Sequence, residues 1–283
     1  MTVERIPYRF LCRGGTAAAL TALNEVPLER ELVFETDTHR SKLGDGVTAY
    51  NALPYVSGGT GGGATDVDRY ATSVVSLLRM QTGTVVDDCG KAWTLSGDAH
   101  VVSTAPFGGS SVLLDGVGDY FSTPASADFN FGSGEWSVEA IVRFNTPTGS
   151  AGILGQWDSS TAQQAWALYM SGGALTMRFR DTSGSYRDTS ITFTPISGAW
   201  YWLAAGRDAL GTVRLLVNGA VAASNTFPQT ILTSTKPVVC GIVQGFEGLF
   251  DMPANVAGIR VCKGLSRFTT GYPPLWRQFE PLS

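Results

Sequence analysis

Short segments in which apolar and polar residues alternate constrain the fold of this chain more than any other feature. Apolar residues occupy every second position of Trp136–Phe144 and of Leu175–Arg180, as in a strand with one buried face. Val213–Val217 alternates in the same way and runs into Asn218-Gly219, a pair that favours a two-residue hairpin turn because both residues tolerate positive φ. These periods predict half-buried antiparallel strands.

Turn residues separate these segments about every 10 to 20 residues, as expected of a β-sandwich. The chain is 43% hydrophobic and 16% charged, with 34 Gly and 13 Pro among 283 residues, a balance that favours short strands and many turns. We therefore expect a mostly β protein. The turn signals are Asp115-Gly116, Gly132-Ser133-Gly134, Ser171-Gly172-Gly173 and Ser183-Gly184.

A glycine-rich run, Ser57–Ala64, divides the chain into two regions with different sequence patterns. It supplies few side chains for packing and is typical of a flexible linker. A GxGxxA pattern inside it lacks the preceding strand and the following Lys-Ser/Thr that a nucleotide site requires. We assign residues 1–57 to a small module, 58–72 to a linker and 73–283 to a large antiparallel β-sandwich.

The N-terminal module is predicted to be a meander of very short strands with one helix, capped by Thr16 and ended before Pro27. So small a module has too few large apolar side chains for a stable core of its own, so we expect it to bury its apolar faces against copies of itself. Its predicted elements are strands at Ile6–Phe10, Leu32–Phe34 and Arg40–Leu43, a helix at Thr16–Asn24, and a hairpin turn at Asp45-Gly46.

Charge and hydropathy exclude two kinds of partner. The net charge is −4, and basic residues gather no more closely than in the loose group Arg260, Lys263 and Arg267, so we expect no nucleic-acid partner. No apolar stretch approaches the length of a membrane span, and charged residues interrupt Met1–Gly15, so neither membrane insertion nor a secretion signal is expected. We expect a soluble protein made in a cytoplasm.

The cysteines indicate neither a metal site nor a disulfide framework. They are scattered, without a CxxC pair or a histidine at ligand spacing. We expect reduced, structural thiols at Cys12, Cys89, Cys240 and Cys262.

A set of motifs spans about Arg13 to Val56. They are Arg13-Gly14-Gly15-Thr16-Ala17-Ala18, Phe34-Glu35-Thr36-Asp37-Thr38, Arg40, Lys42, Gly44-Asp45-Gly46, Thr48, Tyr50-Asn51 and Leu53-Pro54-Tyr55. In this order and spacing they resemble the N-terminal domain of phage tropism determinants and tail-fibre proteins. The resemblance implies a module at the virion-proximal end of a homotrimeric fibre, in contact with other virion proteins.

A second set of motifs spans about Ser73 to Pro274. They are Phe107-Gly108-Gly109-Ser110-Ser111-Val112-Leu113-Leu114-Asp115-Gly116-Val117-Gly118-Asp119-Tyr120, Ser126-Ala127-Asp128-Phe129-Asn130-Phe131-Gly132, Trp136-Ser137-Val138-Glu139, Leu215-Leu216-Val217-Asn218-Gly219, Gly258-Ile259-Arg260-Val261 and Arg267-Phe268-Thr269. They resemble the concanavalin A-like, laminin-G jelly rolls of phage tail proteins. The resemblance implies two stacked antiparallel sheets and a binding role, often toward glycans.

Hydrolytic chemistry lacks its usual spacings. Glu35-Thr36-Asp37 is the only Glu-x-Asp triplet and is better explained as a polar turn, no GxSxG elbow occurs, and only His39 and His100 could act as histidine bases. Unpaired acids such as Glu139, Asp158 and Glu247 could meet in space, so a glycan-degrading enzyme stays an alternative. We expect neither catalysis nor a cofactor.

Aromatic residues in polar segments are better candidates for a binding site, since sugar rings stack on aromatic faces while polar groups bind their hydroxyls. Trp157 and Tyr186 lie in such loop-like stretches, and we predict ligand contacts at Trp157, Asp158, Tyr186 and Arg187. Packing at the sandwich edge or against a neighbouring subunit explains the two rings equally well. Core packing is the expectation for aromatic residues in alternating segments, namely Trp136, Trp166, Tyr169, Trp200 and Trp202.

Related laminin-G sandwiches often bind calcium at the sheet edge, and two of the expected acids are missing here. Met80-Gln81-Thr82-Gly83 stands where relatives have Phe-Asp-Gly, and Ala257-Gly258 stands where they have Asp-Glu. The remaining acids are expected to serve as turn residues, so we predict no structural metal. These acids are Asp87, Asp88, Asp115 and Asp119.

Three functions remain open. A virion tail fibre or tail protein that recognises a host-surface glycan or protein comes first. A head-decoration or structural virion protein without receptor binding comes second, and a glycan-degrading depolymerase third. We expect the protein in the virion, assembled in the host cytoplasm.

Overall fold

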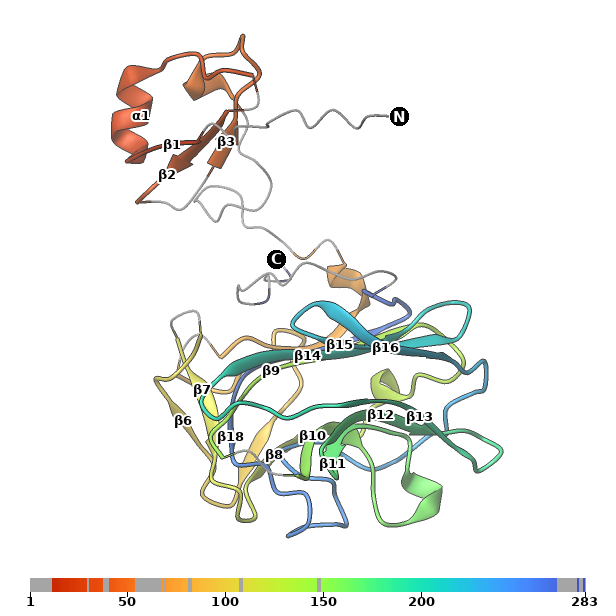
Figure 1. The fold of residues 1–283 in the computed structure, drawn as a ribbon. Coiled ribbons are helices and arrows are strands. Elements are labelled where there is room, and N and C mark those ends of the chain that lie inside the picture. The colour runs from red at the N-terminus through yellow and green to blue at the C-terminus, as the bar shows by residue number, and fades with distance from the viewer. Residues whose placement is uncertain are drawn as a thin grey trace, which may run out of the picture. The chain divides into compact units, whose positions relative to one another are not determined.

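The chain forms two compact units, Met1–Thr65 and Asp66–Ser283. A computed structural model describes residues 12–29, 31–37, 41–53, 68, 70–80, 83–106, 109–146, 149–268, 279 and 282 (Figure 1). The predicted strand at Ile6–Phe10 and residues 58–67 of the predicted linker lie outside these ranges. Asp68 and residues 70–72, which we had placed in the linker, belong to the second unit.

The described part of the first unit is a small mixed sheet with one helix. Thr16 caps the helix as predicted, because its side-chain oxygen accepts a hydrogen bond from Ala19 N at 3.2 Å, and Asn24 ends it in the left-handed region. Among its described residues, Leu20, Val33 and Tyr50 form a buried apolar cluster. The elements are β1 (Cys12–Gly15), α1 (Ala17–Leu23), β2 (Leu32–Glu35), β3 (Ser41–Leu43) and the 3₁₀ turn η1 (Tyr50–Ala52).

Two predictions for this unit are wrong. The strands do not form a meander, because β1 pairs with β2 in parallel and α1 makes the crossover that a parallel pair needs. Asp45-Gly46 is not a hairpin turn, since β3 pairs antiparallel with β2 and no strand follows Gly46 among the described residues of the unit. The Asp45 carboxylate instead accepts hydrogen bonds from Val47 N and Thr48 N in a local turn.

The described strands of the second unit form two antiparallel sheets, which we name after β11 and β9 (Figure 1). The β11 sheet consists, in spatial order, of β13 (Tyr186–Thr192), β12 (Ala174–Arg180), β11 (Trp166–Ser171), β10 (Ala151–Gln156), β17 (Val238–Cys240), β8 (Tyr120–Thr123) and β5 (Thr94–Ser96). The β9 sheet consists of β16 (Ala220–Thr226), β15 (Thr212–Val217), β14 (Trp200–Arg207), β9 (Trp136–Phe144), β18 (Ala254–Lys263), β7 (Ser111–Leu114) and β6 (His100–Val102), and β4 (Val74–Leu78) also pairs with β18. Short 3₁₀ turns lie at η2 (Ala71–Ser73), η3 (Ala127–Phe129) and η4 (Thr161–Gln163).

The predicted antiparallel β-sandwich is therefore confirmed. The two sheets face each other across one core, in which β9 contributes Trp136, Val138 and Phe144 and β11 contributes Trp166 and Leu168. Burying such large side chains contributes about 1.5–3 kcal/mol each. The hairpin between β15 and β16 also forms as predicted, with positive φ at both Asn218 and Gly219.

One prediction about β9 needs correction, because the strand is buried on both faces rather than on one. Its outward Ile141 packs in a second apolar cluster with Trp202 and Phe279. Trp202 is thus buried as expected, but outside the central core.

The outward Glu139 of β9 belongs to a buried ion network. Arg260 donates to both Glu139 oxygens, at 2.7 and 2.9 Å, and to Asp68 at 2.9 Å, while Arg267 also pairs with Asp68 at 2.9 Å. Burial alone would raise the pKa of Asp68, but Arg267 and Arg260 outweigh it and hold the pKa below its ordinary value. The network joins the start of the second unit to its last strand, and it removes two members of the loose basic group from the accessible surface.

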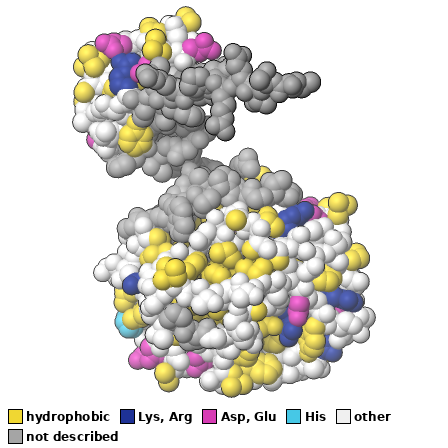
Figure 2. Space-filling view, in the orientation of Figure 1, with side chains coloured by type: hydrophobic (Ala, Val, Ile, Leu, Met, Phe, Trp, Pro, Cys, Tyr) yellow, Lys and Arg dark blue, Asp and Glu magenta, His cyan; other side chains and the backbone are white. Residues whose placement is uncertain are grey.

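Figure 2 shows acidic and basic side chains scattered over the face in view, without a basic patch. Within the described ranges, no helix has the length and apolar character needed to cross a membrane. Cys89, Cys240 and Cys262 are free thiols, as expected, while the side chain of Cys12 lies outside the described part.

Asp68→Asn should destabilise the second unit, because it leaves part of the positive charge of a buried arginine pair uncompensated. We expect the free energy of unfolding at pH 7 to fall by about 3–5 kcal/mol. A carboxyl with a lowered pKa contributes stability above its unfolded pKa and loses it as pH falls through the folded pKa. We therefore expect the unmodified chain to lose stability below about pH 4 and the variant to lose less.

Denaturant titration of both proteins across this pH range measures the effect. Asp88→Asn is the matched control, since its pair with Arg79 is partly exposed and should change stability by about 1 kcal/mol or less. Equal stability of Asp68→Asn and the unmodified chain would contradict the role given to the network.

Candidate functional site

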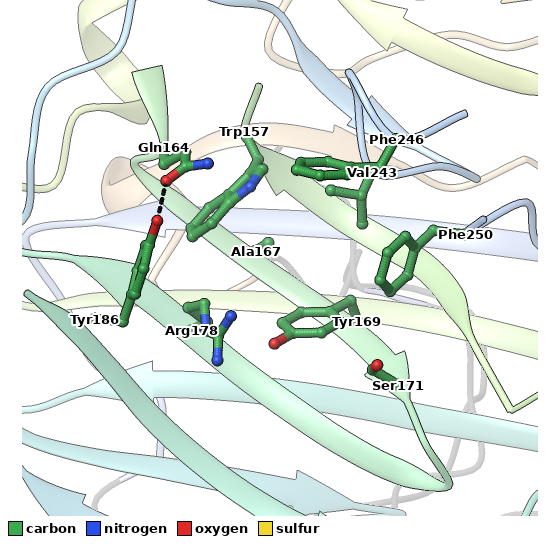
Figure 3. A pocket seen from close by; sticks show the side chains of 10 residues that line it. All are labelled: Trp157, Gln164, Ala167, Tyr169, Ser171, Arg178, Tyr186, Val243, Phe246 and Phe250. Carbon is green, nitrogen blue, oxygen red and sulfur yellow. Dashed lines mark hydrogen bonds between the residues drawn. The ribbon is translucent and has the colours of Figure 1, made fainter. Parts of the chain in front are cut away.

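A pocket of about 240 Å³ lies on the outer face of the β11 sheet (Figure 3). Its floor is β11, where Ala167, Tyr169 and Ser171 alternate with core residues such as Leu168 and therefore face outward. Arg178 on the neighbouring β12 extends the floor, because it lies opposite Ala167 in the ladder.

One side of the pocket is formed by Trp157 and Tyr186. Trp157 follows β10 and Tyr186 begins β13, and their rings are 6.0 Å apart at 30°. The Tyr186 hydroxyl donates to Gln164 Oε1 at 2.6 Å, the bond drawn in Figure 3. Tyr186 remains 46% exposed, so its ring is available to a ligand at the rim.

The opposite wall comes from the loop between β17 and β18, through Val243, Phe246 and Phe250. Phe250 lies edge-on to Tyr169, with ring centroids 5.8 Å apart, and Phe246 packs edge-on against Phe250. A side chain at Gly152 of β10 would lie 2.1 Å from the Ile242 backbone, so glycine is needed for this loop to approach the sheet.

Arg178 lies between Tyr186 and Tyr169 in Figure 3, with its guanidinium 5.1 Å from the first ring centroid and 5.7 Å from the second. Its Nε and Nη2 donate to the two Asp188 oxygens at 2.7 and 2.6 Å, a bidentate pair across β12 and β13 that raises the pKa of Arg178. Burial raises the pKa of Tyr169. The pocket thus combines several aromatic faces with a fixed, charged arginine.

Of the predicted contacts, Trp157 and Tyr186 meet in this pocket, whereas Asp158 and Arg187 do not line it. The sequence places Tyr186 and Arg187 in a loop-like stretch, but β13 begins at Tyr186, so these neighbours point to opposite faces of the sheet. Arg187 lies opposite the core residue Phe179 and pairs with Asp181 at 2.8 Å.

Asp158 is held outside the pocket by local bonds. Its carboxylate accepts a hydrogen bond from Ser160 N at 2.9 Å and pairs with Lys236 at 3.1 Å, and both contacts lower its pKa. Trp157 is only 7% exposed, which agrees with packing at the sandwich edge, the alternative that the sequence left open for this ring. Its indole packs against Ala167 and Val243 and presents an edge to the pocket.

Sequence reasoning missed most of the lining. Tyr169 was assigned to the core, although its odd position in β11 relative to Trp166 could have placed it on the outer face. Gln164, Arg178, Phe246 and Phe250 had no sequence signal of their own, since a turn, another strand and a distant loop bring them together.

The acids considered for catalysis are separately engaged. Glu139 is paired with Arg260 in the buried network, Asp158 with Lys236, and Glu247 accepts a hydrogen bond from Gly245 N at 2.8 Å. His100 is exposed and contacts the Asp98 carbonyl at 2.8 Å, whereas His39 lies outside the described residues.

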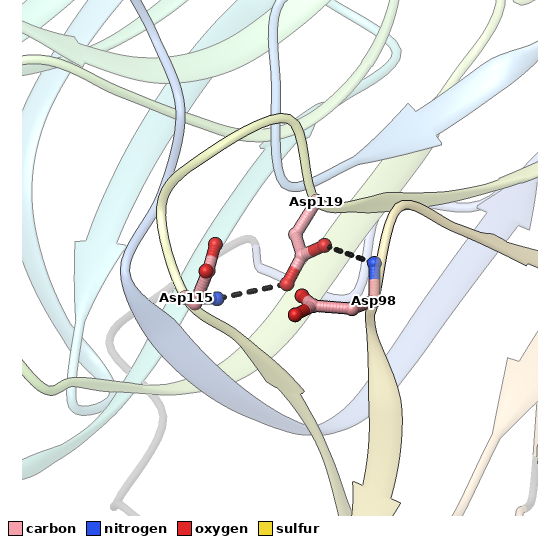
Figure 4. Close-up of side chains that lie close together, drawn as sticks. All are labelled: Asp98, Asp115 and Asp119. Carbon is pink, nitrogen blue, oxygen red and sulfur yellow. Dashed lines mark hydrogen bonds between the residues drawn. The ribbon is translucent and has the colours of Figure 1, made fainter.

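A second cluster consists of Asp98, Asp115 and Asp119, each with a carboxylate oxygen within 4.8 Å of the others (Figure 4). Asp98 was not among the acids singled out from the sequence. Both Asp119 oxygens are used in turns, since they accept hydrogen bonds from Asp98 N at 2.8 Å and Asp115 N at 3.0 Å. A side-chain hydrogen bond with Asp119, together with the negative charges of Asp119 and Asp115, raises the pKa of Asp98.

Three carboxylates would supply part of the six to eight oxygen ligands of calcium. Asp87 and Asp88 do not join them. Asp87 is bonded to Ser76, Trp93 and backbone N–H groups, and Asp88 pairs with Arg79. The prediction of no structural calcium remains open.

The fold is that of a lectin-like β-sandwich with a pocket on the outer face of one sheet. A protein-family model described as the concanavalin A-like lectin/glucanases superfamily, Laminin_G_3, matches residues 115–254, so a domain of this superfamily is present in the chain. The predicted laminin-G-like class is thereby confirmed. A comparison with curated proteins found no match.

Solved structures with the same fold include receptor-binding domains of toxins. The binding domain of Paraclostridial Mosquitocidal Protein 1 has a TM-score of 0.59 at 13% identity, over 70% of this chain and 51% of that one. The botulinum neurotoxin serotype D binding domain has a TM-score of 0.55 at 15% identity, over 70% and 50%. The serotype D ligand-binding domain in complex with N-acetylneuraminic acid has a TM-score of 0.54 at 15% identity, over 70% and 49%. The chain thus spans about half the length of these structures, and at this identity the likeness shows the fold.

Asp98→Asn tests whether the cluster of Asp98, Asp115 and Asp119 binds a cation or only stabilises turns. Without a cation, the raised pKa of Asp98 means that its charge opposes folding as pH rises through that pKa, so the substitution should leave the thermal midpoint at pH 7 unchanged or higher. Chelator should then have no effect on the unmodified chain, because a ligand that does not bind cannot stabilise the native state. Thermal unfolding with chelator, calcium and magnesium measures both. A fall on chelation that calcium restores, together with a lower midpoint for Asp98→Asn, would establish a calcium site.

Proposed function

We propose that this chain is a phage tail fibre or tail protein that binds a host-surface glycan in the aromatic pocket of its β-sandwich. The observation that supports this best is the pocket itself, where the rings of Trp157, Tyr169 and Tyr186 lie around Arg178. Aromatic faces stack on the apolar faces of sugar rings, and a few placed polar groups fix their orientation. A volume of about 240 Å³ suits one or two sugar units rather than a large cofactor.

Two further observations support the proposal. The motifs of Arg13–Val56 resemble virion-proximal domains of tail fibres, which is the basis for the virion location and for contacts with other virion proteins. The fold is shared with toxin receptor-binding domains, one of them solved with N-acetylneuraminic acid. We therefore expect binding without catalysis.

Tyr186→Ala tests the pocket with little risk to folding, because the ring is 46% exposed. Loss of one stacking contact, worth on the order of 1 kcal/mol, should weaken glycan binding about fivefold. Calorimetry with a short monovalent oligosaccharide, chosen from a glycan array, avoids masking by multivalent binding. Trp157→Phe keeps a ring in the wall and should weaken binding less.

Leu210→Ala is the control, since this side chain is 81% exposed and does not line the pocket. Its affinity should equal that of the unmodified chain. If Tyr186→Ala binds as well as the control, the pocket is not the glycan site.

We also expect a homotrimer assembled through the first unit. The described surface of this unit includes Leu23, Val26, Leu28, Leu43 and Val47, which are 46–82% exposed, while the core that its described residues form is small. Light scattering of the full chain should give three times the 30.0 kDa chain mass. Leu28→Asp should reduce that mass, whereas Leu210→Asp on the second unit should not. A mass of one chain for the unmodified protein would exclude the trimer.

A further inference from the structure

Arg178 and Gln164 give the aromatic pocket spare N–H donors, beside the hydroxyls of Tyr169, Ser171 and Tyr186, which can donate or accept. Arg178 uses Nε and Nη2 for Asp188, which leaves Nη1, and Gln164 uses Oε1 for Tyr186, which leaves the amide nitrogen. Among the described residues, none accepts a hydrogen bond from these two nitrogens or from Trp157 Nε1. No carboxylate lines the pocket within the described part of the chain.

These donors are held in place. Gln164 is 4% exposed, and its amide is oriented by the Tyr186 hydroxyl. The cross-strand pair with Asp188 fixes the guanidinium plane of Arg178. An incoming acceptor would thus meet groups that lose little further freedom on binding.

Charge is unbalanced on the Tyr186 side of the pocket. Arg180 lies 5.4 Å from the Tyr186 ring centroid and donates to the carbonyls of Gly184 and Thr161, and no described carboxylate forms an ion pair with it. Asp188 therefore compensates the charge of only one of two arginines, Arg178 and Arg180. The pairs Asp158–Lys236 and Asp181–Arg187 are each neutral, and Glu247 lies in the opposite loop beside Phe246.

This arrangement discriminates among ligand classes. A cationic ligand is disfavoured, because Arg178 already occupies the space between the Tyr169 and Tyr186 faces. A neutral sugar could bind the hydroxyls of Tyr169, Ser171 and Tyr186, but it would leave the positive charge of Arg178 and Arg180 unused. A carboxylate only accepts, which matches fixed N–H donors and the surplus positive charge.

We propose that the pocket recognises an acidic sugar, with the sugar carboxylate bound by Arg178 Nη1 and the ring stacked beside Tyr186. This inference rests on the proposed glycan-binding function and specifies its ligand as a uronic or nonulosonic acid unit. Arg180 raises the local positive potential, and Gln164 donates to a second acceptor of the same unit.

The test compares matched glycans on an array probed with the full chain. Uronic-acid and nonulosonic-acid oligosaccharides are each displayed beside the same oligosaccharide with its carboxylate reduced to the primary alcohol. At least one acidic member should bind about tenfold to a hundredfold more tightly than its reduced partner, the range expected for a hydrogen bond between charged groups. Added salt should weaken that preference.

Variants then assign the preference to residues. Arg178→Gln combined with Asp188→Asn removes both charges together and leaves no unpaired acid, and it should abolish the preference for the acidic member while retaining binding of the reduced one. Arg180→Gln replaces an arginine without an acidic partner and should reduce the preference in part. Tyr186→Ala should weaken both members alike.

The outcomes separate the two claims. Equal binding of acidic and reduced partners, lost in Tyr186→Ala, would retain the glycan pocket and overturn the acidic ligand. A preference for the acidic member that survives in the Arg178/Asp188 double variant, with its thermal midpoint unchanged, would also overturn the binding of the carboxylate by Arg178. Binding to no member of the array would overturn the proposed function together with this inference.

Discussion

Burial of alternate side chains between two facing sheets is the constraint on which the rest of the second unit depends. Trp166 and Leu168 must enter the core, so Tyr169, the residue after Leu168, must face outward. The same alternation sends Phe179 inward, and Arg178 and Arg180 outward. The pocket floor is therefore the reverse side of the core, and its side chains can vary without disturbing the packing between the sheets.

The large sandwich could be predicted because its local signals agree with its tertiary structure. The alternation of Trp136–Phe144 and the Asn218-Gly219 turn each indicate one conformation, and the structure has both. The second buried face of β9 could not be predicted, because Phe279 and Asp68, which are distant in sequence, cover it. In the first unit Thr16 was a sufficient signal for the helix, but strand partners depend on the crossover and not on local composition.

The candidate site was less predictable for a related reason. Polar surroundings correctly singled out Trp157 and Tyr186 as rings outside the central core, and the two do lie together. Polar surroundings did not distinguish a loop from an edge strand. Because Tyr186 and Arg187 are consecutive residues of a strand, Arg187 points to the opposite face of the sheet from Tyr186. The remaining lining comes from segments whose approach depends on backbone contact, as at Gly152, and a single sequence does not show such contacts.

The net charge of the chain and the charges around the pocket lead to different conclusions about the charge of a ligand. A net charge of −4 weakens nonspecific attraction to polyanions, yet exposed charges are screened within about 8 Å in physiological salt. A ligand in the pocket therefore experiences Arg178, Arg180 and Asp188 more strongly than acids elsewhere on the surface. Because Asp188 fixes Arg178 through two nitrogens and leaves the third, the ion pair orients the guanidinium for a second acceptor instead of consuming it. An acidic protein can in this way carry the anion-selective site that we propose.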